Sequence, residues 1–524
     1  MKLRTIVKIA ITSSVVLLCS GFALYSFFRL SAAEGQKDFN LYELVPSTTS
    51  AVFVTDDVLE FVAEVDELTC SKNQQYLYVS KLFSYLKQSL YALSEDTPHG
   101  LSRQMNQMLI SFHEPDNERN QVLYCRLGNG DKELVNRFVR KYISSLYPPK
   151  TFIYKGEEII IYPMADGDFL ACYLTSDFMA LSFQKKLIEN VIDAYKSGKS
   201  LADDSTFTGI RAPKKSAAAA TIYTRMQGMM GWTEFDMKMK DDFIYFSGIT
   251  HDADTCFAFI NQLRQQQSVK GFPGEVLPST AFYFSRQGIT DWVSLLSYGN
   301  AQGQSVPART SEVQNRDKEF SRYLMENAGQ DLVACLFQRE DTVQGAAAVL
   351  SLSVADVTEA ERMLRALVNA ASADEGRRNP RITFCYTVNK AYPIYRLPQT
   401  TLFEQLTSFA EPTLDVYAAF YGGRLLLAPD ADALAHYIRQ LDKGEVLNGA
   451  MVYQTGMDHL SDSYHFMLMA DFDHIFQQSE NHVRFVPDFF LRNADFFRHF
   501  TLFVQFACAD GVVYPNIVLK YKSE

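Results

Sequence analysis

The sequence predicts an α+β fold of two tandem homologous repeats, each an antiparallel sheet with packed helices, preceded by one N-terminal transmembrane helix. Three observations lead to this prediction. An uncharged segment lies near the N-terminus, short matches recur in the same order along the chain, and strand-like runs are joined by short polar turns. A chain of 524 residues also exceeds what one hydrophobic core usually organises, so about two to four domains are expected.

The composition is that of a folded globular protein. Hydrophobic residues make up 47% and charged residues 21% of the chain, which argues against long disorder, collagen-like repeats and a polytopic membrane protein. The 50 Lys and Arg residues stand against 61 Asp and Glu residues, for a net charge of −11. An acidic balance of this size argues against a nucleic-acid partner.

The N-terminal segment is expected to anchor the protein in the inner membrane. Basic residues precede an uncharged run from Ile9 to Phe28, which is long enough to cross the roughly 30 Å hydrocarbon core of a bilayer. The positive-inside rule makes residues 1–30 a cytoplasmic tip and signal-anchor, and it places the rest of the chain in the periplasm. Residues 31–40 then form a linker.

Two other interpretations of this segment stay open. A cleaved signal peptide has a shorter apolar region of about 7 to 15 residues, although Ser31 and Ala33 would supply small residues at the cut. A lipid anchor on Cys19 needs a small residue before the cysteine, and Leu18 stands there. The remaining cysteines show no CxxC pair and hence no zinc-site spacing, and a disulfide between Cys125 and Cys172 is left open.

Matching segments along the chain indicate an internal duplication. Residues 45–48, Val-Pro-Ser-Thr, match residues 277–280, Leu-Pro-Ser-Thr, at an offset of 277 − 45 = 232, and an apolar strand follows each. Residues 188–201 match residues 434–447 at an offset of 246, with a glycine just past each predicted helix. The offsets keep their order, so the chain divides into repeat 1, residues 41–270, and repeat 2, residues 271–524.

Each repeat is predicted to run strand, helices, paired strands, helix, a four-strand stretch, helix and three strands. The helices that begin at Asp131 and Val357 carry apolar residues at the i, i+3, i+4 spacing of one buried stripe. Residues 155–157, 421–423 and 510–511 have the polar, glycine-containing composition of hairpin turns. Helices interspersed with hairpins favour an α+β arrangement over a doubly wound parallel sheet.

An aromatic-rich insertion distinguishes the second repeat. The closing strands near Tyr245 and Tyr514 differ by 514 − 245 = 269, so 269 − 246 = 23 extra residues lie near residues 478–500. These aromatics either pack on their own domain or form an interaction surface for a partner. The candidate interaction surface consists of His482, Phe485, Phe489, Phe490, Phe496 and Phe497.

No catalytic, cofactor-binding or metal-binding residue is predicted. Ser182-x-x-Lys185 and Lys196-Ser-Gly198 match two motifs of penicillin-binding enzymes, but they lie too close together and Asn300 falls in the wrong order. The Asp and His residues between Asp458 and His474 follow no standard ligand spacing, and surface or helix-capping roles are expected for them, with Asp473 near a helix N-cap.

Five segments of the sequence occur together in a recognisable combination. They are the anchor, the opening Leu-Val-Pro-Ser-Thr-Thr-Ser-Ala-Val-Phe-Val at residues 44–54, the turn at residues 154–156, the strand at Leu181 and residues 196–198. In this combination the chain resembles a family of membrane-anchored, periplasm-facing proteins of Bacteroides-type anaerobes whose activity is unassigned. The resemblance implies a cell-envelope setting and carries over no functional residue.

The function predicted from the sequence is that of a periplasmic binding or scaffold module without catalytic activity, with an envelope protein as candidate partner. The alternatives are an envelope hydrolase with a non-motif active site and a binder of apolar ligands or unfolded chains. The sequence leaves the oligomeric state open.

Overall fold

The computed structural model describes residues 39–72, 105–113, 119–128, 131–139, 147–164, 167–211, 218–225, 231–250, 258–296, 311–339, 345–374, 382–388, 390–407, 413–477, 486 and 488–522. The predicted signal-anchor lies outside these residues. Within them, no helix has both the length and the apolar composition that crossing a bilayer requires.

Most strands belong to a single antiparallel sheet of 20 strands, as the α+β prediction requires. In the first half of the chain these are β1 (Ala51–Thr55), β2 (Met108–Phe112), β3 (Gln121–Arg126), β4 (Lys150–Tyr154), β5 (Glu157–Pro163), β6 (Phe169–Leu174), β7 (Phe178–Ser182), β8 (Ala220–Thr224), β9 (Thr233–Lys240) and β10 (Phe243–Thr250). Hydrogen bonds connect them in the spatial order β4, β5, β6, β7, β3, β2, β1, β8, β9, β10.

The second half uses the same order of pairing. Its strands are β12 (Ala281–Gly288), β13 (Ala328–Gln338), β14 (Ala346–Val354), β15 (Ile382–Tyr386), β16 (Ala391–Arg396), β17 (Tyr417–Tyr421), β18 (Arg424–Ala428), β20 (Phe466–Asp471), β21 (Phe500–Ala509) and β22 (Val512–Tyr521). They follow one another as β15, β16, β17, β18, β14, β13, β12, β20, β21, β22. A separate short pair joins β11 (Val269–Lys270) to β19 (Ser463–Tyr464).

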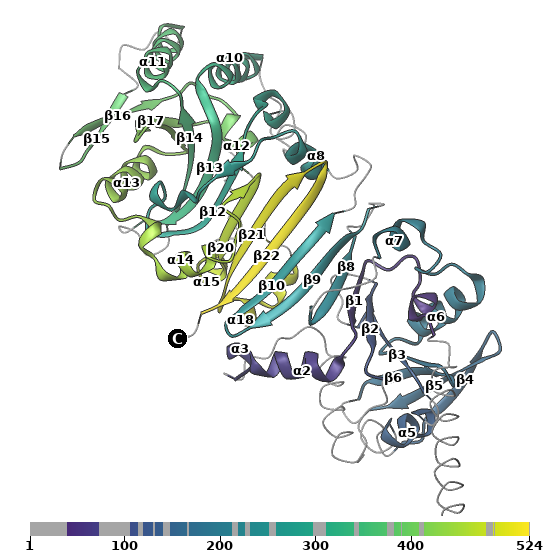
Figure 1. Ribbon diagram of the computed structural model, residues 1–524. Coiled ribbons are helices and arrows are strands. Elements are labelled where there is room, and N and C mark those ends of the chain that lie inside the picture. The colour runs from purple at the N-terminus through teal and green to yellow at the C-terminus, as the bar shows by residue number, and fades with distance from the viewer. Residues whose placement is uncertain are drawn as a thin grey trace, which may run out of the picture.

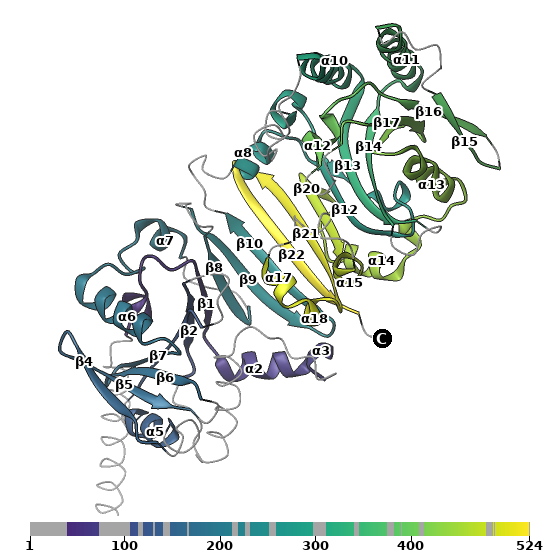
Figure 2. The ribbon, with the colours of Figure 1, turned by 180° about the vertical axis from the view of Figure 1, so that it is seen from behind.

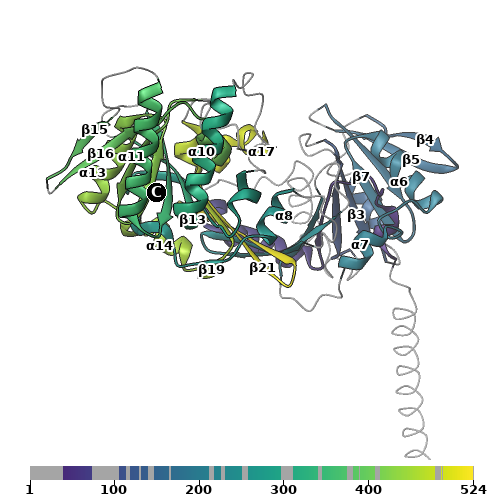
Figure 3. The same cartoon turned by 90° about the horizontal axis from the view of Figure 1, so that it is seen from above.

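The two halves meet at their last strands. β10 pairs antiparallel with β22, and Ser247 lies opposite Asn516 near the middle of the pair. This pairing makes one sheet that extends in opposite directions from its centre (Figure 1). As a result, β4 and β15 lie at opposite ends of the molecule (Figure 3).

The helices cover the sheet through their apolar residues. In the first half they are η1 (Leu41–Leu44), α2 (Val58–Glu67), α3 (Thr69–Lys72), α5 (Asp131–Phe138), α6 (Lys185–Ser197) and α7 (Ser205–Ile210), and α8 (Ala258–Arg264) follows β10. In the second half they are η3 (Pro273–Glu275), α10 (Ser311–Asn327), α11 (Val357–Asp374), α12 (Leu402–Leu406), α13 (Ala431–Asp442), η4 (Leu447–Gly449), α14 (Met451–Met457), α15 (Phe472–Phe476), α17 (Asp488–Arg492) and α18 (Ala494–Phe497).

Local chemistry explains where several elements end. Gly198 follows α6 with φ of 62°, and Gly444 lies just beyond α13 with φ of 76°, so both glycines that were expected to stop a helix adopt the left-handed conformation. In the β4–β5 turn, Lys155 and Gly156 have φ of 47° and 84°. Positive φ at both central residues is typical of the tight turns that join antiparallel strands.

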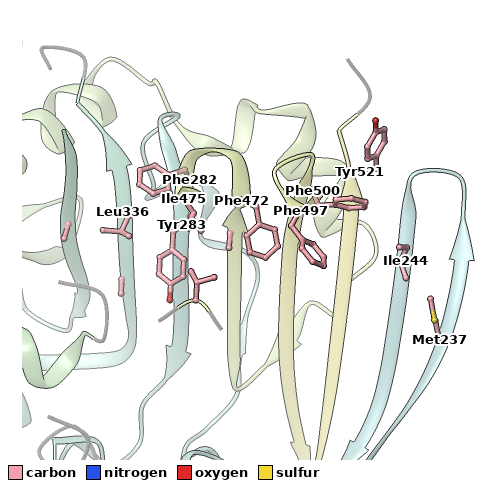
Figure 4. Packing of buried hydrophobic residues seen from close by; sticks show 14 of the residues in the cluster. Met237, Ile244, Phe282, Tyr283, Leu336, Phe472, Ile475, Phe497, Phe500 and Tyr521 are labelled. Atoms are coloured by element: carbon pink, nitrogen blue, oxygen red, sulfur yellow. The ribbon is translucent and has the colours of Figure 1, made fainter. Parts of the chain in front are cut away.

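Buried side chains form three clusters. One lies in the first half around α6, and a second lies in the second half around α13. The third and largest contains residues of both halves, and its members include Ile244 of β10 and Phe500 and Tyr521 beside the junction (Figure 4). The halves are therefore joined by packing as well as by hydrogen bonds. Cys125 and Cys172 are both buried free thiols, so the disulfide that was left open between them is not formed.

Candidate functional site

The aromatic-rich segment lies between β20 and β21, where residues 472–499 connect the strands. The corresponding connection between β8 and β9 comprises only residues 225–232. The extra length contributes α15, α17 and α18, and α17 and α18 lie beside the ends of β21 and β22 (Figure 2).

The described aromatics of this segment pack on the protein itself. The ring centroids of Phe490 and Phe497 are 4.8 Å apart, and that of Phe490 lies 4.9 Å from that of Phe472. Phe496 contacts Phe500 of β21 at 5.0 Å, and Phe497 is only 7% exposed. Packing on their own domain, the alternative considered for these residues, therefore holds for Phe490, Phe496 and Phe497. His482, Phe485 and the side chain of Phe489 lie outside the described residues, and an interaction role for the set stays a prediction.

Of the Asp and His residues between Asp458 and His474, only Asp471, Asp473 and His474 lie at the start of α15, while Asp462 accepts a hydrogen bond from the backbone N–H of Gly271 and His465 from that of Cys508. Asp471, not Asp473, is the N-cap, and its Oδ1 accepts a hydrogen bond from the backbone N–H of Asp473 at 3.0 Å. Lys522 Nζ lies 2.7 Å and His474 Nδ1 3.5 Å from the same oxygen. Across the described part of the chain, no group of three His, Cys, Asp or Glu side chains is placed to hold a metal ion.

The two motif matches do not form a catalytic pair. Ser182 is fully buried and its Oγ donates to the carbonyl oxygen of Gln121, while Lys185 pairs with Glu189 at 2.7 Å. Lys196 pairs with Glu157 at 2.8 Å. Ser182 thus joins β7 to β3, Lys185 pairs within α6 and Lys196 joins α6 to β5, so these side chains have separate partners.

A polar pocket opens in the first half, between η1 and the ends of β1, β2 and β3. Its volume is about 140 Å³. Gln107 bridges two charged residues of its wall, because its Oε1 accepts from Arg126 and its Nε2 donates to Asp56 Oδ1 at 3.3 Å. The pocket is lined by Leu41, Tyr42, Val54, Asp56, Gln107, Met108, Leu109, Arg126 and Arg211.

Tyr42 links the base of this pocket to its charged rim. The guanidinium of Arg211 lies 4.1 Å from the centre of the Tyr42 ring, within the range of a cation–π contact. Burial raises the pKa of Tyr42 to about 12, with Arg211 and Arg126 acting against the shift and Asp56 and Glu234 adding to it. Tyr42 is therefore a neutral hydrogen-bonding group at physiological pH.

The second half has a buried ion cluster where the first half has this pocket. Asp331 Oδ2 lies 3.0 Å from Arg286 Nε, and Asp331 Oδ1 lies 3.3 Å from Arg424 Nη1. Arg286 also donates to the carbonyl oxygen of Gly271 at 2.8 Å, and Arg424 donates to Ser351 Oγ at 2.6 Å. Burial raises the pKa of Asp331, but Arg424, Ser353 and Arg286 outweigh it and hold this pKa below its ordinary value.

Strand register identifies which residues of the two sites correspond. The backbone N–H of Thr49 donates to Pro46 O as that of Ala281 donates to Pro278 O, which gives an offset of 278 − 46 = 232 and matches Val54 with Arg286. Val54 lies opposite Leu109, and Arg286 lies opposite Val333. Leu109 therefore corresponds to Val333. Gln107 precedes Leu109 by two residues and Asp331 precedes Val333 by two residues, so Gln107 corresponds to Asp331. The neutral Gln107 occupies the position of the second half's central carboxylate.

The two ends of the sheet differ in their exposed residues. At one end, β15 pairs with β16 and with no other described strand. Its outer surface presents Phe384, Tyr386 and the adjacent Val388, which are 54%, 71% and 97% exposed. At the other end, Ile153 of β4 is 72% exposed, but Lys150 and Lys155 lie on either side of it and prolines at 148 and 149 precede the strand.

Neither the pocket nor the β15 end was found by motif reasoning. The pocket residues come from distant parts of the chain and match no motif, and only the run of uncharged residues from 382 to 388 signals the exposed strand in the sequence. No protein-family model, curated protein or solved structure matches this chain.

Proposed function

We propose that this protein is a membrane-anchored, periplasmic scaffold without catalytic activity, which binds a partner protein by adding a strand of the partner to β15. The observation that carries the proposal is the uncharged, apolar edge of β15, which pairs with β16 and with no other strand that the structure describes. The proposal includes an anchor at residues 9–28, two homologous halves, and membership of the Bacteroides-type envelope family that the sequence resembles.

Strand register supports the homology of the halves. Pro46 and Pro278, which differ by the offset of 232, each form an isolated bridge. Their partners are Ser200 and Val446, which differ by 446 − 200 = 246. The turn residues Asp241 and Asp510, with φ of 51° and 50°, give 510 − 241 = 269. These are the offsets of the sequence matches, and the strands of both halves pair in one order. A duplicated ancestral unit accounts for both facts.

The exposed edge of β15 favours strand addition over other binding modes. An edge strand leaves one row of backbone N–H and C=O groups unpaired, and these groups bind an extended chain of another molecule. Soluble proteins usually block such edges with Lys or Pro, as β4 does with Lys150, Lys155 and the preceding prolines. No charge or proline lies between residues 382 and 388, although Pro380 and Arg381 precede β15 and Lys390 follows it. Unlike β4, which contains Lys150, β15 therefore has no charged residue within the strand. Phe384 and Tyr386 would contact apolar side chains on the added strand.

The test is site-specific photocrosslinking of the full-length protein in its native cells. A photoreactive phenylalanine analogue replaces Val388, and the matched control carries it at Ile153 in β4, where the apolar residue is similarly exposed. We expect an adduct with a protein of the envelope from position 388 and none above background from position 153. Introducing Phe384→Lys into the Val388 probe chain is expected to abolish the adduct, because a charge on the edge opposes pairing.

Three results would overturn this proposal. Equal adducts at both positions would show nonspecific contact, and no adduct at position 388 would show that β15 has no partner. An adduct of twice the chain mass would identify a second copy of this chain instead of a different partner protein.

A further inference from the structure

We propose that the end of the sheet that carries β4 docks on the headgroup surface of the inner membrane. Tyr147, Phe152 and Ile153 enter the interfacial region of the bilayer, and the lysines around them contact the phosphate groups of anionic lipids. The inference rests on the anchor at residues 9–28 that the proposed function includes. It adds an orientation, in which β4 faces the membrane and β15, at the opposite end of the sheet, points away from it (Figure 3).

Three apolar side chains are exposed at this end. Phe152 and Ile153 of β4 are 42% and 72% exposed, and Tyr147, which lies just before the strand, is 73% exposed. β4 pairs with β5 and with no other described strand, so it forms the rim of the sheet. Successive residues of a strand point to opposite faces, but at the rim both faces border the same end of the molecule. Aromatic side chains are enriched where proteins meet the headgroup level of a membrane.

Lysines surround these apolar residues. Lys150 begins β4, Lys155 follows it, and Lys185 Nζ lies 5.1 Å from the centre of the Phe152 ring. Residues 150–163 and 185–199 contain six Lys against four Asp and Glu, a local charge of 6 − 4 = +2 in a protein whose net charge is −11. Long lysine side chains lie along apolar surface and extend their ammonium groups to lipid phosphates.

Most of the acidic groups here are already paired. Three of the four pair with a lysine of the same region at 2.7 or 2.8 Å, namely Asp193 with Lys155, Glu157 with Lys196 and Glu189 with Lys185. The fourth, Glu158, forms no ion pair within the described residues, and neither do Lys150 and Lys199. The unpaired cations therefore outnumber the unpaired carboxylate, which complements an anionic surface.

The polypeptide enters the first half beside this end. Phe39, the first described residue, has its ring centroid 5.9 Å from that of Tyr195 in α6. The next residue of the helix, Lys196, donates from Nζ to the carbonyl oxygen of Lys155 in the β4–β5 turn at 2.6 Å. Ten residues, 29–38, separate the predicted anchor from Phe39, and ten residues span at most about 35 Å. An anchor at residues 9–28 thus keeps the β4 end close to the bilayer.

A lipid surface suits this edge better than a strand of another protein. Lys150 and the prolines at 148 and 149 oppose strand addition at β4. The backbone groups along its outer edge need water or headgroups as partners, so the strand cannot enter the hydrocarbon core. Docking is therefore limited to side chains at headgroup depth, where water remains available to the backbone.

The test is fluorescence quenching of the full-length protein in nanodiscs of phosphatidylcholine mixed with phosphatidylglycerol. A small fluorescent amino acid replaces Ile153, and the matched control carries it at Val388, which is exposed at the opposite end. A nitroxide on the lipid headgroups quenches a fluorophore that lies next to it. We expect loss of fluorescence at position 153 and none above background at position 388.

A charge variant assigns the contact to the lysines. Lys150→Glu in the Ile153 probe chain is expected to reduce the quenching, because repulsion from the phosphates replaces attraction. Lys390→Glu changes an exposed lysine beside β15 by the same charge, so it is the matched control and should leave the quenching unchanged. Circular dichroism of both variants checks that they fold.

Three results overturn the docking alone: an anchored protein with no quenching at position 153, equal quenching at positions 153 and 388, and quenching that Lys150→Glu changes no more than Lys390→Glu. A protein that does not enter nanodiscs, and that alkaline carbonate releases from membranes, refutes the anchor and with it the docking. None of these results affects strand addition at β15. A photocrosslink from position 153 to a lipid lacks the mass of a protein, so it does not alter the control in that experiment.

Discussion

The first and second halves of the molecule place different side chains on the same order of strands. Where β1 and β2 carry Val54 and Gln107, β12 and β13 carry Arg286 and Asp331. In the second half this exchange produces a buried ion cluster, and in the first half it leaves an open pocket with charged walls. The comparison shows that the same order of strands carries a partly buried ion cluster in one half and a polar pocket in the other.

The difference has an energetic basis. A buried ion pair gains little overall, because desolvation of the charges offsets their attraction, but losing one partner leaves an uncompensated buried charge. Asp331 has two such partners, so the second half is expected to tolerate almost no change at this position. The first half, with a neutral Gln107 beside a pocket, is expected to tolerate much more.

The largest effect is expected for Asp331→Ala. Removing the carboxylate leaves the partly buried Arg286 and Arg424 without their counter-ion, which should cost about 3 to 5 kcal/mol of unfolding free energy. The matched variant Gln107→Ala should cost less than about 1 kcal/mol. Urea unfolding monitored by tryptophan fluorescence and circular dichroism checks both, and equal losses in the two variants would contradict the distinction between the sites.

The next effect concerns the segment that only the second half has. Phe497 packs against Phe490, Phe496 and Phe472, so Phe497→Ala should cost about 3 kcal/mol through lost burial and a cavity. The same unfolding measurement applies, with Leu491→Ala on partly exposed α17 as control. A loss below about 1 kcal/mol for Phe497→Ala would show that the segment is not part of the core and would favour the interaction surface instead.

A smaller loss of stability is expected for a substitution at Gly288 than for those above. The offset of 232 makes Gly288 equivalent to Asp56 of the first half. A Cβ atom on Gly288 would lie 2.0 Å from the backbone oxygen of Gln267, a contact that flexible side chains cannot relieve. Gly288→Ala should therefore cost about 1 to 3 kcal/mol, and Asp56→Ala, at an exposed position, less than about 0.5 kcal/mol. Thermal melting of the two variants tests this, and a neutral Gly288→Ala would disprove the close approach.

The smallest effect is the pH dependence that His474 contributes in the second half. A hydrogen bond to Asp471 raises the pKa of His474 above its ordinary value of 6.5. Burial raises the pKa of Asp471, but His474 and Lys522 outweigh it and hold this pKa below 3.8. The residue of the first half that corresponds to Asp471 is Arg225.

The signs of these shifts define the pH range. The stability contributed by His474 is fully present below its unfolded pKa of 6.5 and is lost as pH rises through its higher folded pKa. The stability contributed by Asp471 is present above its unfolded pKa of 3.8 and is lost as pH falls through its lower folded pKa. Burial lowers the pKa of His113 to about 4 and that of His465 below 6.5, so these two residues add stability as pH rises over the same range. His474→Gln should therefore make the slope of melting temperature against pH, from pH 6 to about pH 8, more positive than in the unmodified protein. An unchanged slope in the variant would show that His474 makes no such contribution.

Part of this architecture could be predicted from the sequence because the signals are local. The turn at Lys155 and Gly156 and the glycines after α6 and α13 follow from neighbouring residues. The aromatic insertion near residues 478–500 was located differently, from the change in offset between matching segments, and it lies between β20 and β21. The antiparallel α+β class was confirmed because its signals are local too. Asp473 was expected near a helix N-cap, and it lies two residues after the N-cap Asp471, in the first turn of α15.

The sequence by itself determined the class of the fold, the turns and the order of its elements, since backbone conformation follows from side chains within a few positions. Only the tertiary structure decided which charged residues meet. Asp331 is 45 residues from Arg286 and 93 from Arg424, and Gln107 is 51 residues from Asp56. Such contacts depend on the register between strands that are distant along the chain, and no local pattern specifies that register.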